Sequence, residues 1–372
     1  MKKIKLAVIF GGMSTEHNVS ITSGTSVIKN LNKEKYEIFP IYINEEGKWF
    51  EYSKKIEEID VIEVGEKIEE ITPIENVMVY LEKCDVVFPV LHGLYGEDGT
   101  IQGMLELLQK PYVGCKVLSS SICMDKAYSK IIFEKAKINQ AKYIYLKRMG
   151  NDYVYIDNKF NEKIYKLQEI ARLVKNELSF PVFVKPSNSG SSVGIKKAHD
   201  EIELIKAIEN ASLYDVKILI EEEIKGREVE CAVFGRNKVL TTCVGEILPA
   251  EEFYTFDAKY KNEESKVIIP ANIPENISDE IRSTAEKAFK AVDGSGLARV
   301  DFFIEEGTNK VIINEINTMP GFTQISMYPK LWEKMGYSYS KLLDGLIELA
   351  FVKLDLRNGE ENNKWKNVFV NE

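Results

Sequence analysis

The sequence predicts an α/β protein built from two or three domains. With 372 residues, the chain is too long to fold around one compact core. In its first third, apolar segments of strand length alternate with segments of helical length, which is typical of a parallel sheet covered by helices. A later segment rich in glycine and serine, residues 184–194, joins two strand-like segments in a different region.

The first region is expected to form an α/β unit with functional loops at one edge of its sheet. Residues 11–16 and 92–100 each follow an expected strand, and loops at the carboxyl ends of parallel strands commonly carry function. The charged stretch 52–75 is expected to be a solvated insertion. The expected strands are residues 4–10, 36–43 and 85–90, and the expected helices are residues 14–30, which Ser14 or Thr15 can cap, and 101–109.

The rest of the chain is expected to form two more units. A helix is expected over residues 119–135, and the third unit is expected to begin at Lys217. The long segment 246–265 has little regular pattern, as is typical of a lid. We therefore expect an N-terminal α/β domain over 1–125, a central domain over 126–216, a C-terminal domain over 217–357 and a polar tail over 358–372.

Composition and charge exclude several classes of protein. Hydrophobic residues make up 44% of the chain and charged residues 29%, as in soluble globular proteins. The net charge of −9 argues against nucleic acid as the main partner. The five cysteines form no Cys-x-x-Cys pair, which favours buried thiols in a reducing cytoplasm over disulfides or zinc. The short apolar run 4–10 ends at Gly11-Gly12 with no small-residue cleavage pattern, so a buried strand fits better than a signal peptide. No segment approaches the length of a membrane span, so we expect no membrane partner.

The segment 184–194 carries Lys185 followed by glycines and serines. Small side chains let backbone N–H groups converge on an anion, and a lysine adds a positive charge. The spacing is neither that of a P-loop nor that of a dinucleotide-binding turn. The pattern therefore indicates a phosphate held between strands, with an ordinary polar hairpin as the alternative.

A second hairpin, near residues 297–317, indicates a magnesium site. If its turn centres on Thr308, two cross-strand pairs bring Arg299, Asp301, Glu315 and Asn317 to one face. Two carboxylates and an amide oxygen form the hard, all-oxygen site that Mg²⁺ prefers. The alternative is a solvated face with salt bridges. Apolar side chains are expected on the other face, including Ile312, whereas Phe303 and Ile313 are expected on the charged face.

Together these features resemble the ATP-grasp superfamily, and more closely the D-alanine–D-alanine ligase family over essentially the whole chain. Several motifs occur in the order that this family has. They are Gly11-Gly12-x-Ser14-x-Glu16, Leu91-His92-Gly93-x-x-Gly96-Glu97-Asp98-Gly99-Thr100, Met124-Asp125-Lys126, Lys185-Pro186-x4-Ser191-Ser192-Val193-Gly194, Asp257-Ala258-Lys259-Tyr260, Arg299-Val300-Asp301 and Asn314-Glu315-Ile316-Asn317.

The resemblance implies an ATP-grasp fold, in which two α+β domains following the N-terminal domain sandwich ATP. It implies ATP-dependent ligation of two D-alanine molecules through a D-alanyl phosphate, for peptidoglycan precursor synthesis. Asp301, Glu315 and Asn317 would bind two Mg²⁺ or Mn²⁺ ions. The ATP-binding residues implied by the resemblance are Lys126, Lys185, Ser189, Ser191, Ser192, Val193, Glu221, Glu222, Glu223, Ile224, Glu228 and Lys259.

The resemblance also implies the residues that bind and activate D-alanine. Glu16 would hold the ammonium of the first D-alanine and would form a hydrogen-bonded set with Ser191 and Tyr260. Arg299 would stabilise the oxyanion. The other expected substrate contacts are His92, Gly321, Ser326 and the apolar Met327. The family is often dimeric, so a homodimer is expected, although composition alone indicates no interface.

Four alternatives stay open at this point. D-serine or D-lactate could replace the second D-alanine, although the apolar Met327 favours D-alanine. A ligase with other substrates is disfavoured by the Glu16, Ser191 and Tyr260 set. A regulatory protein on a degenerate fold would lack metal ligands that this chain has. An NAD-dependent oxidoreductase would need a third glycine after Gly11-Gly12 and an acidic residue at the end of the second strand.

Overall fold

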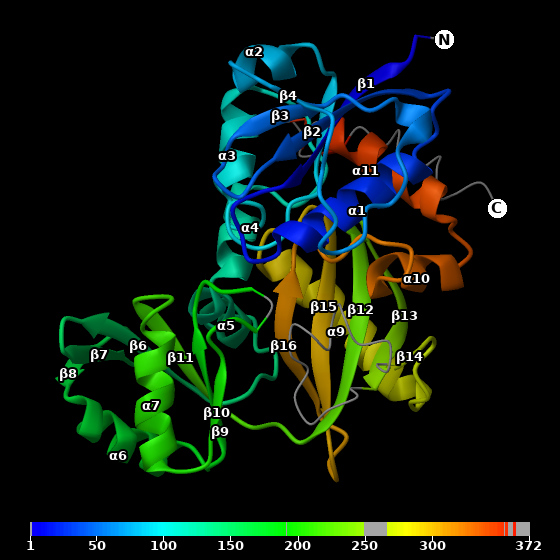
Figure 1. Cartoon of the computed structure of the whole chain (residues 1–372). Coiled ribbons are helices and arrows are strands. Elements are labelled where there is room, and N and C mark those ends of the chain that lie inside the picture. Colours follow the sequence, from blue (N-terminus) through cyan, green and yellow to red (C-terminus); the bar gives the residue numbers. More distant parts are fainter. Residues whose placement is uncertain (1, 191, 249–265, 353, 356–359, 362–372) are drawn as a thin grey trace.

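The computed structural model describes residues 2–190, 192–248, 266–352, 354–355 and 360–361. In this part of the chain the strands form three large sheets and one short two-stranded sheet, β17 (Leu354–Asp355) with β18 (Glu360–Glu361). Figure 1 shows the first sheet at the top, the third directly below it and the second at the lower left. The α/β class predicted from the sequence is confirmed.

The first sheet has the strand order β4-β3-β2-β1-β5. Strand β1 pairs in parallel with β2 and β5, as the alternating pattern predicted, whereas β2, β3 and β4 pair antiparallel. The segment 52–75, expected to be a solvated insertion, is mostly exposed, and it adds an edge strand, β4, that the sequence did not indicate. The bounds are β1 Ile4–Gly11, β2 Tyr36–Ile43, β3 Trp49–Tyr52, β4 Ile71–Pro73, β5 Val86–Pro89, α1 His17–Asn30, η1 Ile56–Glu58, α2 Val77–Glu82 and α3 Thr100–Leu107.

The helix expected over 119–135 is two helices, α4 (Val117–Met124) and α5 (Lys126–Lys135). The break lies at Asp125, whose extended backbone leaves the helical region. Its carboxylate accepts hydrogen bonds from Ala127 N and Tyr128 N, so that it caps α5. The prediction of one helix was wrong because an aspartate between two helical segments can start a new helix.

The second sheet is antiparallel, in the order β10-β9-β11-β6-β7-β8, and helices α6 and α7 pack against it. Strand β11 lies at its centre, between β9 and β6. The third unit was expected to begin where β11 begins, and the sheet shows that it begins later, because β11 buries its apolar residues between strands of the second sheet. The bounds are β6 Tyr143–Met149, β7 Asp152–Ile156, β8 Glu162–Tyr165, α6 Leu167–Glu177, β9 Val182–Pro186, β10 Lys196–Ala198, α7 Glu201–Ala211 and β11 Lys217–Glu222.

The third sheet is also antiparallel, in the order β14-β13-β12-β15-β16. Helix α9 packs on one face, where it shares a core with Val300 and Phe302. Helix α10 contacts β12 and β13 and belongs to another cluster of buried side chains. The bounds are β12 Gly226–Gly235, β13 Val239–Leu248, β14 Lys266–Ile268, α9 Glu275–Ala291, β15 Gly296–Glu305, β16 Val311–Asn317, α10 Met327–Lys334 and α11 Tyr339–Ala350.

The first and third sheets share a hydrophobic core. Helix α11 contacts α1 and β5 of the first unit as well as β15 of the third. At their junction the ring of Phe322 stacks edge to face on Phe88 of β5, with 5.8 Å between ring centroids. These two units are therefore held together by buried apolar contacts, and the residues between them are fixed in position.

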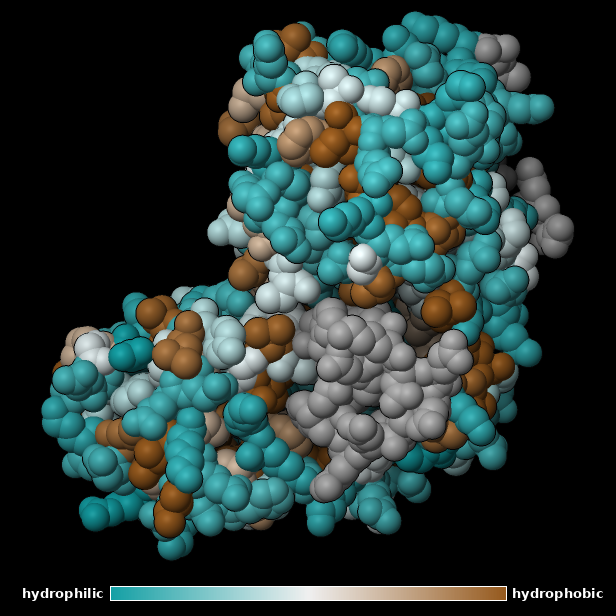
Figure 2. Space-filling view, viewed as in Figure 1, coloured by the Kyte–Doolittle hydropathy of each residue, from teal (hydrophilic) through white to brown (hydrophobic). Residues whose placement is uncertain are grey.

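The surface agrees with the composition. Figure 2 shows a face that is mostly hydrophilic, with hydrophobic side chains scattered over it. Among the described helices, none is long and apolar enough to cross a membrane.

Candidate active site

The hairpin of β15 and β16 has the predicted register at its charged end. Asp301 lies opposite Glu315, and Arg299 lies opposite Asn317. These four side chains therefore share one face, because residues directly opposite in a ladder point the same way.

A β-bulge after Asp301 changes the rest of the hairpin. Beyond the bulge, Phe302 pairs with Ile313 and Phe303 pairs with Ile312. Ile313 is 1% exposed and packs with Phe302 in the core under α9. The expectation that Ile313 shares the charged face and that Ile312 lies on the opposite face was therefore wrong, because one extra residue in β16 reverses the alternation.

Arg299 is held by carboxylates on two neighbouring strands. Its Nε and Nη2 donate to the two oxygens of Asp301, each at 2.7 Å. Nε also lies 3.0 Å from Oε2 of Glu230, which is opposite Asp301 on β12. Asn317 Nδ2 donates to Asp301 Oδ2 at 2.9 Å. This fork-shaped pairing fixes the guanidinium plane. Glu230 was missed from the sequence, although strand alternation places it on the same face as Glu228.

Lys126 connects the charged hairpin with the glycine- and serine-rich loop. Its Nζ donates to the carbonyl oxygen of Ser189 at 2.6 Å and lies 3.7 Å from Oε2 of Glu315. Within the loop, Ser189 Oγ donates to Val193 O at 2.7 Å, and Ser192 has a positive φ of 61°. The loop therefore folds back on itself beside the charged hairpin, as a phosphate-binding loop would.

Lys185 and Lys130 both form ion pairs with Glu221. The carboxylate and Lys130 are almost completely buried, at 5% and 4% side-chain exposure, and Lys185 is 15% exposed. Burial alone would raise the pKa of Glu221, but the two ammonium groups outweigh it and lower the pKa to about 2. Glu221 was expected at the adenine pocket. That expectation concerned its backbone and stays a prediction, while its side chain holds Lys185 and Lys130. Lys130 was missed because a lone lysine in a helical segment gives no signal.

The neighbouring acidic residues also have protein partners. Glu222 accepts a hydrogen bond from Lys142 N at 2.8 Å, and Glu223 forms an ion pair with Lys197 at 2.8 Å. Ile224 lies in the link from β11 to β12, and Glu228 lies on β12 opposite Phe303. The residues expected around adenine therefore lie where the second sheet passes into the third.

Glu16 lies between two loops. It is 8% exposed and immediately precedes α1. A Cβ atom added at Gly93 or at Gly190 would lie 2.6 or 2.5 Å from its Oε2, so the carboxylate packs directly against both backbones. Ser14 Oγ donates to His92 O at 2.6 Å. The expected cap of α1 was wrong in detail, because Ser14 joins the loop after β1 to the loop after β5.

His92 is buried and both of its ring nitrogens have partners. Nδ1 lies 2.8 Å from Met319 O, and Nε2 lies 2.9 Å from Ser23 Oγ. Burial lowers the pKa of His92, although the nearby Glu16 carboxylate opposes this. His92 was expected to contact substrate. Its imidazole instead fixes the position of the loop.

Like His92, Glu97 connects the loop after β5 with the segment after β16 that contains Met319. Its oxygens accept hydrogen bonds from Gly93 N and Met319 N, each at 2.9 Å. Burial and the Glu16 carboxylate raise the pKa of Glu97 to about 8, although the two backbone donors and Arg299 oppose the shift. The charges of Glu16 and Arg299 both act on Glu97, so the site combines the first unit with the charged hairpin. Glu97 was given no role from the sequence, although it lies within a quoted motif.

The expected contacts of the second D-alanine lie before and at the start of α10. Ser326 Oγ accepts from Thr323 N at 3.1 Å and lies 2.8 Å from Thr323 Oγ1. A Cβ added at Gly321 would lie 3.0 Å from Ser326 Oγ, so a side chain at this position would crowd the hydroxyl. Met327 is 7% exposed and packs in the core against Gly245. Ser191, Lys259 and Tyr260 lie outside the described residues.

The hairpin offers oxygen ligands to a metal ion. Among the residues that the structure describes, no three His, Cys, Asp or Glu side chains are grouped to hold one. The hairpin instead offers two carboxylates and the amide of Asn317, whose nitrogen faces Asp301. An all-oxygen set with few protein ligands suits Mg²⁺ bound partly through phosphates.

Comparisons with known proteins agree with this arrangement. The family model described as "D-ala D-ala ligase N-terminus" matches residues 5–115, and that described as "D-ala D-ala ligase C-terminus" matches residues 132–348. A D-alanine–D-alanine ligase B of Clostridium tetani is 50% identical and covers 94% of each chain. A D-alanine–D-alanine ligase of Caldicellulosiruptor bescii is 49% identical and covers 95% of this chain and 96% of that one.

Solved structures confirm the fold expected from the sequence. The VanG D-Ala:D-Ser ligase of Enterococcus faecalis superimposes with a TM-score of 0.79 at 36% identity, over 94% of this chain and all of that one. The D-alanine–D-alanine ligase of Bacillus anthracis complexed with ATP has a TM-score of 0.70 at 31% identity, over 93% and 97% of the two chains. The fold is that of the ATP-grasp enzymes, and this chain belongs to the D-alanine–D-alanine ligase family.

Proposed function

We propose that the chain uses ATP to join two D-alanine molecules. The carboxylate of the first D-alanine attacks the γ-phosphorus of ATP, which releases ADP and leaves D-alanyl phosphate. The amine of the second D-alanine then attacks the acyl carbon, and phosphate leaves. The single observation that carries this proposal is the contact of the Glu16 carboxylate with Gly190 in the phosphate loop, because it brings an ammonium-binding group beside the phosphates.

The nucleotide would bind between the second and third sheets. Lys126, which contacts both the loop and Glu315, would bind the phosphates, and Lys185 would join it from β9. The backbone of residues 189–193 would cover the phosphates. The link after β11, with Glu222, Glu223 and Ile224, would hold adenine through backbone groups, Glu228 would bind the ribose, and Lys259 would reach the phosphates.

Asp301, Glu315 and Asn317 would bind two Mg²⁺ or Mn²⁺ ions. Their shared face and their oxygen donors fit such ions. The ions, when bound, would offset negative charge on the phosphoryl group that is transferred. Arg299 already orients Asp301 through two hydrogen bonds, so the chain holds this carboxylate in one position before any ligand arrives.

The substrate groups are assigned by their charges. Glu16 would bind the first ammonium, in a set with Ser191 and Tyr260 that closes over the site. Arg299 would stabilise the oxyanion formed when the second amine attacks, because its guanidinium is a cation fixed on the charged face of the hairpin. Ser326, with Gly321, would bind the second carboxylate. Met327 and His92 would shape the site without a hydrogen bond to substrate.

The test is the identity of the product. Purified protein is incubated with ATP, MgCl₂ and D-alanine, and ADP release is measured together with the mass of the product. We expect one D-alanyl-D-alanine for each ADP, and none with L-alanine. ADP release without dipeptide, or no reaction with D-alanine, would overturn the proposal. Glu16→Gln should raise the KM for D-alanine more than that for ATP.

D-serine is the second candidate for the second position. It is supported by the similarity to VanG, which is a D-Ala:D-Ser ligase. Relatives at about half identity carry the D-alanine–D-alanine name, which favours D-alanine. In a competition assay with equal D-alanine and D-serine, we expect D-alanyl-D-alanine as the main product, and a main product with D-serine would reverse the assignment.

We further propose a cytoplasmic enzyme whose product is a cell-wall precursor. Its use of ATP and its five free cysteines, four of them buried, support a reducing compartment. We keep the proposed N-terminal domain at 1–125 and the tail at 358–372. The sheets support a boundary between the central and C-terminal domains after Glu222. A homodimer stays a proposal, and light scattering would test it.

A further inference from the structure

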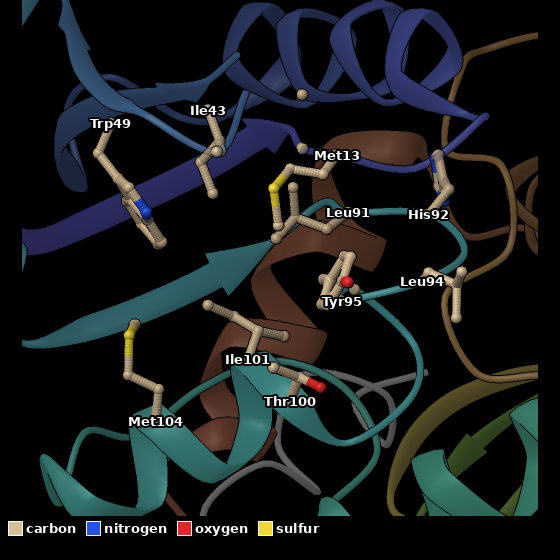
Figure 3. A pocket seen from close by; sticks show the side chains of 14 residues that line it. Met13, Ile43, Trp49, Leu91, His92, Leu94, Tyr95, Thr100, Ile101 and Met104 are labelled. Carbon is tan, nitrogen blue, oxygen red and sulfur yellow. The ribbon is translucent and has the colours of Figure 1, made fainter. Parts of the chain in front are cut away.

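The first unit contains an apolar pocket that shares only His92 with the residues assigned to ATP and D-alanine. The pocket has a volume of about 180 Å³ and lies at the carboxyl edge of the parallel strands. Its walls come from the loop after β1, the β2–β3 connection, the loop after β5 and the first turns of α3. Figure 3 shows Met13, Leu91 and Ile101 pointing into a common space from three of these elements.

The walls of the pocket are held by packing between these elements. A Cβ added at Gly47 would lie 2.6 Å from Met13 Sδ, so the methionine packs on the turn between β2 and β3. A Cβ added at Gly12 would lie 3.5 Å from Leu91 Cδ2, so the loops after β1 and β5 are in contact. Ile101 is 5% exposed and forms part of the wall on α3. The pocket is therefore bounded by packed side chains.

The chemistry of the lining excludes the substrates already assigned. Among the described residues, no Asp, Glu, Lys or Arg lines the pocket, and its accessible lining is mostly apolar. His92 is one of its few polar residues, and both imidazole nitrogens are already used by Met319 and Ser23. A zwitterion such as D-alanine, or a nucleotide, would lose its hydration here without a compensating charge. An uncharged apolar molecule would not.

The size of the pocket fits one ring. An engineered apolar cavity of about 150 Å³ binds benzene. The present pocket is slightly larger and opens to solvent beside Leu94 and Tyr95, which are 42% and 47% exposed. We propose that this pocket is a second small-molecule site that takes an uncharged, compact apolar ligand, such as a singly substituted benzene ring.

The position of the pocket couples it to the D-alanine site, a step that rests on the proposed function. Met13 is three residues before Glu16 in the same loop, and Leu91 precedes His92. Ser14 Oγ donates to His92 O, and Glu16 packs against Gly93. A ligand between Met13 and Leu91 contacts both loops, so it sets their spacing and shifts the seat of the Glu16 carboxylate. Occupancy therefore weakens binding of the first D-alanine.

The first test measures binding without any reaction. Fluorobenzene is titrated with the full chain and followed by ¹⁹F NMR, with 4-fluorobenzoate as the charged control. We expect saturable binding of fluorobenzene with a Kd of about 1 mM and at least tenfold weaker binding of the benzoate. Absence of saturable fluorobenzene binding, or equal binding of the two probes, would overturn the site.

Variants on one helix locate the site. Met104, on α3, lines the pocket, whereas Leu107 on the same helix is 85% exposed and does not. Met104→Trp should fill the pocket and abolish fluorobenzene binding, and Leu107→Trp should leave it unchanged. Met104→Phe serves if the tryptophan variant unfolds. Retained binding in a folded Met104 variant, or loss in Leu107→Trp, would place the ligand elsewhere.

The coupling is tested by kinetics. Saturating fluorobenzene should raise the KM for the first D-alanine by about fivefold and leave the KM for ATP unchanged. The effect should disappear in Met104→Trp. An unchanged or lowered KM would overturn the coupling while the binding result stands. If the protein makes no dipeptide at all, the proposed function fails, and the NMR titration still decides whether the pocket is a site.

Discussion

The candidate active site contains two clusters, each with both acidic and basic side chains. One is buried and is called the closed cluster, and the other is partly exposed and is called the open cluster. Glu221 is almost completely buried between Lys130 and Lys185. Glu315 is 28% exposed and lies 3.7 Å from Lys126, beside an Asp301 that is 14% exposed. The closed cluster satisfies its charge within the protein, whereas the open one can exchange protein contacts for a ligand. The resemblance assigned residues of both clusters to ATP binding. The burial of Glu221 suits a carboxylate that positions Lys185, whereas the exposure of Glu315 suits direct contact with a ligand.

The largest expected effect comes from the open cluster. Glu315→Gln keeps the size of the side chain and removes the negative charge that would face the metal-bound phosphates. We expect kcat to fall by about 100- to 1000-fold, as when one group that stabilises transition-state charge is removed. The free energy of unfolding should change by less than about 1 kcal/mol, because the contact with Lys126 is long and partly exposed.

Steady-state kinetics and urea unfolding test this prediction. Glu306→Gln, in the exposed turn of the same hairpin, is the matched control and should keep normal activity. If Glu315→Gln turned over normally, or if it unfolded as readily as a core variant, the open cluster would not be the metal site.

A change in the closed cluster should reduce the stability of the protein more than its activity. Lys130→Met leaves Glu221 buried with one ammonium in place of two. We expect a loss of stability of about 3 kcal/mol, at the low end for breaking a buried ion pair because Lys185 remains. Expressed as a free energy, the change in the KM for ATP should be smaller than the loss of stability. Steady-state kinetics measure the first, and thermal and urea unfolding measure the second. Adding Glu221→Gln to Lys130→Met should restore part of the loss, and no restoration would contradict the role given to the charge.

Glu97 allows a test by pH. Its pKa is about 8 in the folded protein, above the ordinary glutamate value of 4.5, so the folded state holds the proton more tightly than the unfolded chain. The resulting stability is complete below about pH 4.5 and is lost as the pH rises through about 8. Glu97→Gln stays neutral and should therefore flatten the fall in melting temperature between these values. Asp98→Asn, next in the chain, is the control, and an equal flattening in the control would show that Glu97 is not the titrating group.

The sequence predicted best what depends on local pattern. Strand alternation placed Asp301 opposite Glu315 and Arg299 opposite Asn317, and the register confirms it. The same reasoning failed for Ile313, because a single bulge residue reverses the faces of a strand and leaves no mark in composition. The break at Asp125 was missed for a related reason, since an aspartate inside a helical pattern reads equally as a surface residue.

Contacts between distant segments were beyond the sequence. Lys130 and Glu221 are 91 positions apart, and only the sheet order brings α5 beside β11. Glu97 reaches Met319 N across 222 positions. Burial at such contacts decides whether a charge is structural or available to a ligand, and one sequence does not report it. The motifs therefore indicated the family and its residues, while the division between the two clusters needed the fold.

The smallest expected effect comes from a pair that is exposed in the same unit as the closed cluster. Lys175 on α6 and Glu201 on α7 are 2.7 Å apart, closer than Lys126 and Glu315, yet their side chains are 64% and 39% exposed. Lys175→Met should cost less than about 1 kcal/mol, because water screens the pair before the change and solvates the remaining Glu201 carboxylate after it. Urea unfolding beside Lys130→Met measures the contrast. A loss as large as that of Lys130→Met would mean that distance, and not burial, sets the strength of these pairs, and the distinction between the closed and open clusters would fail with it.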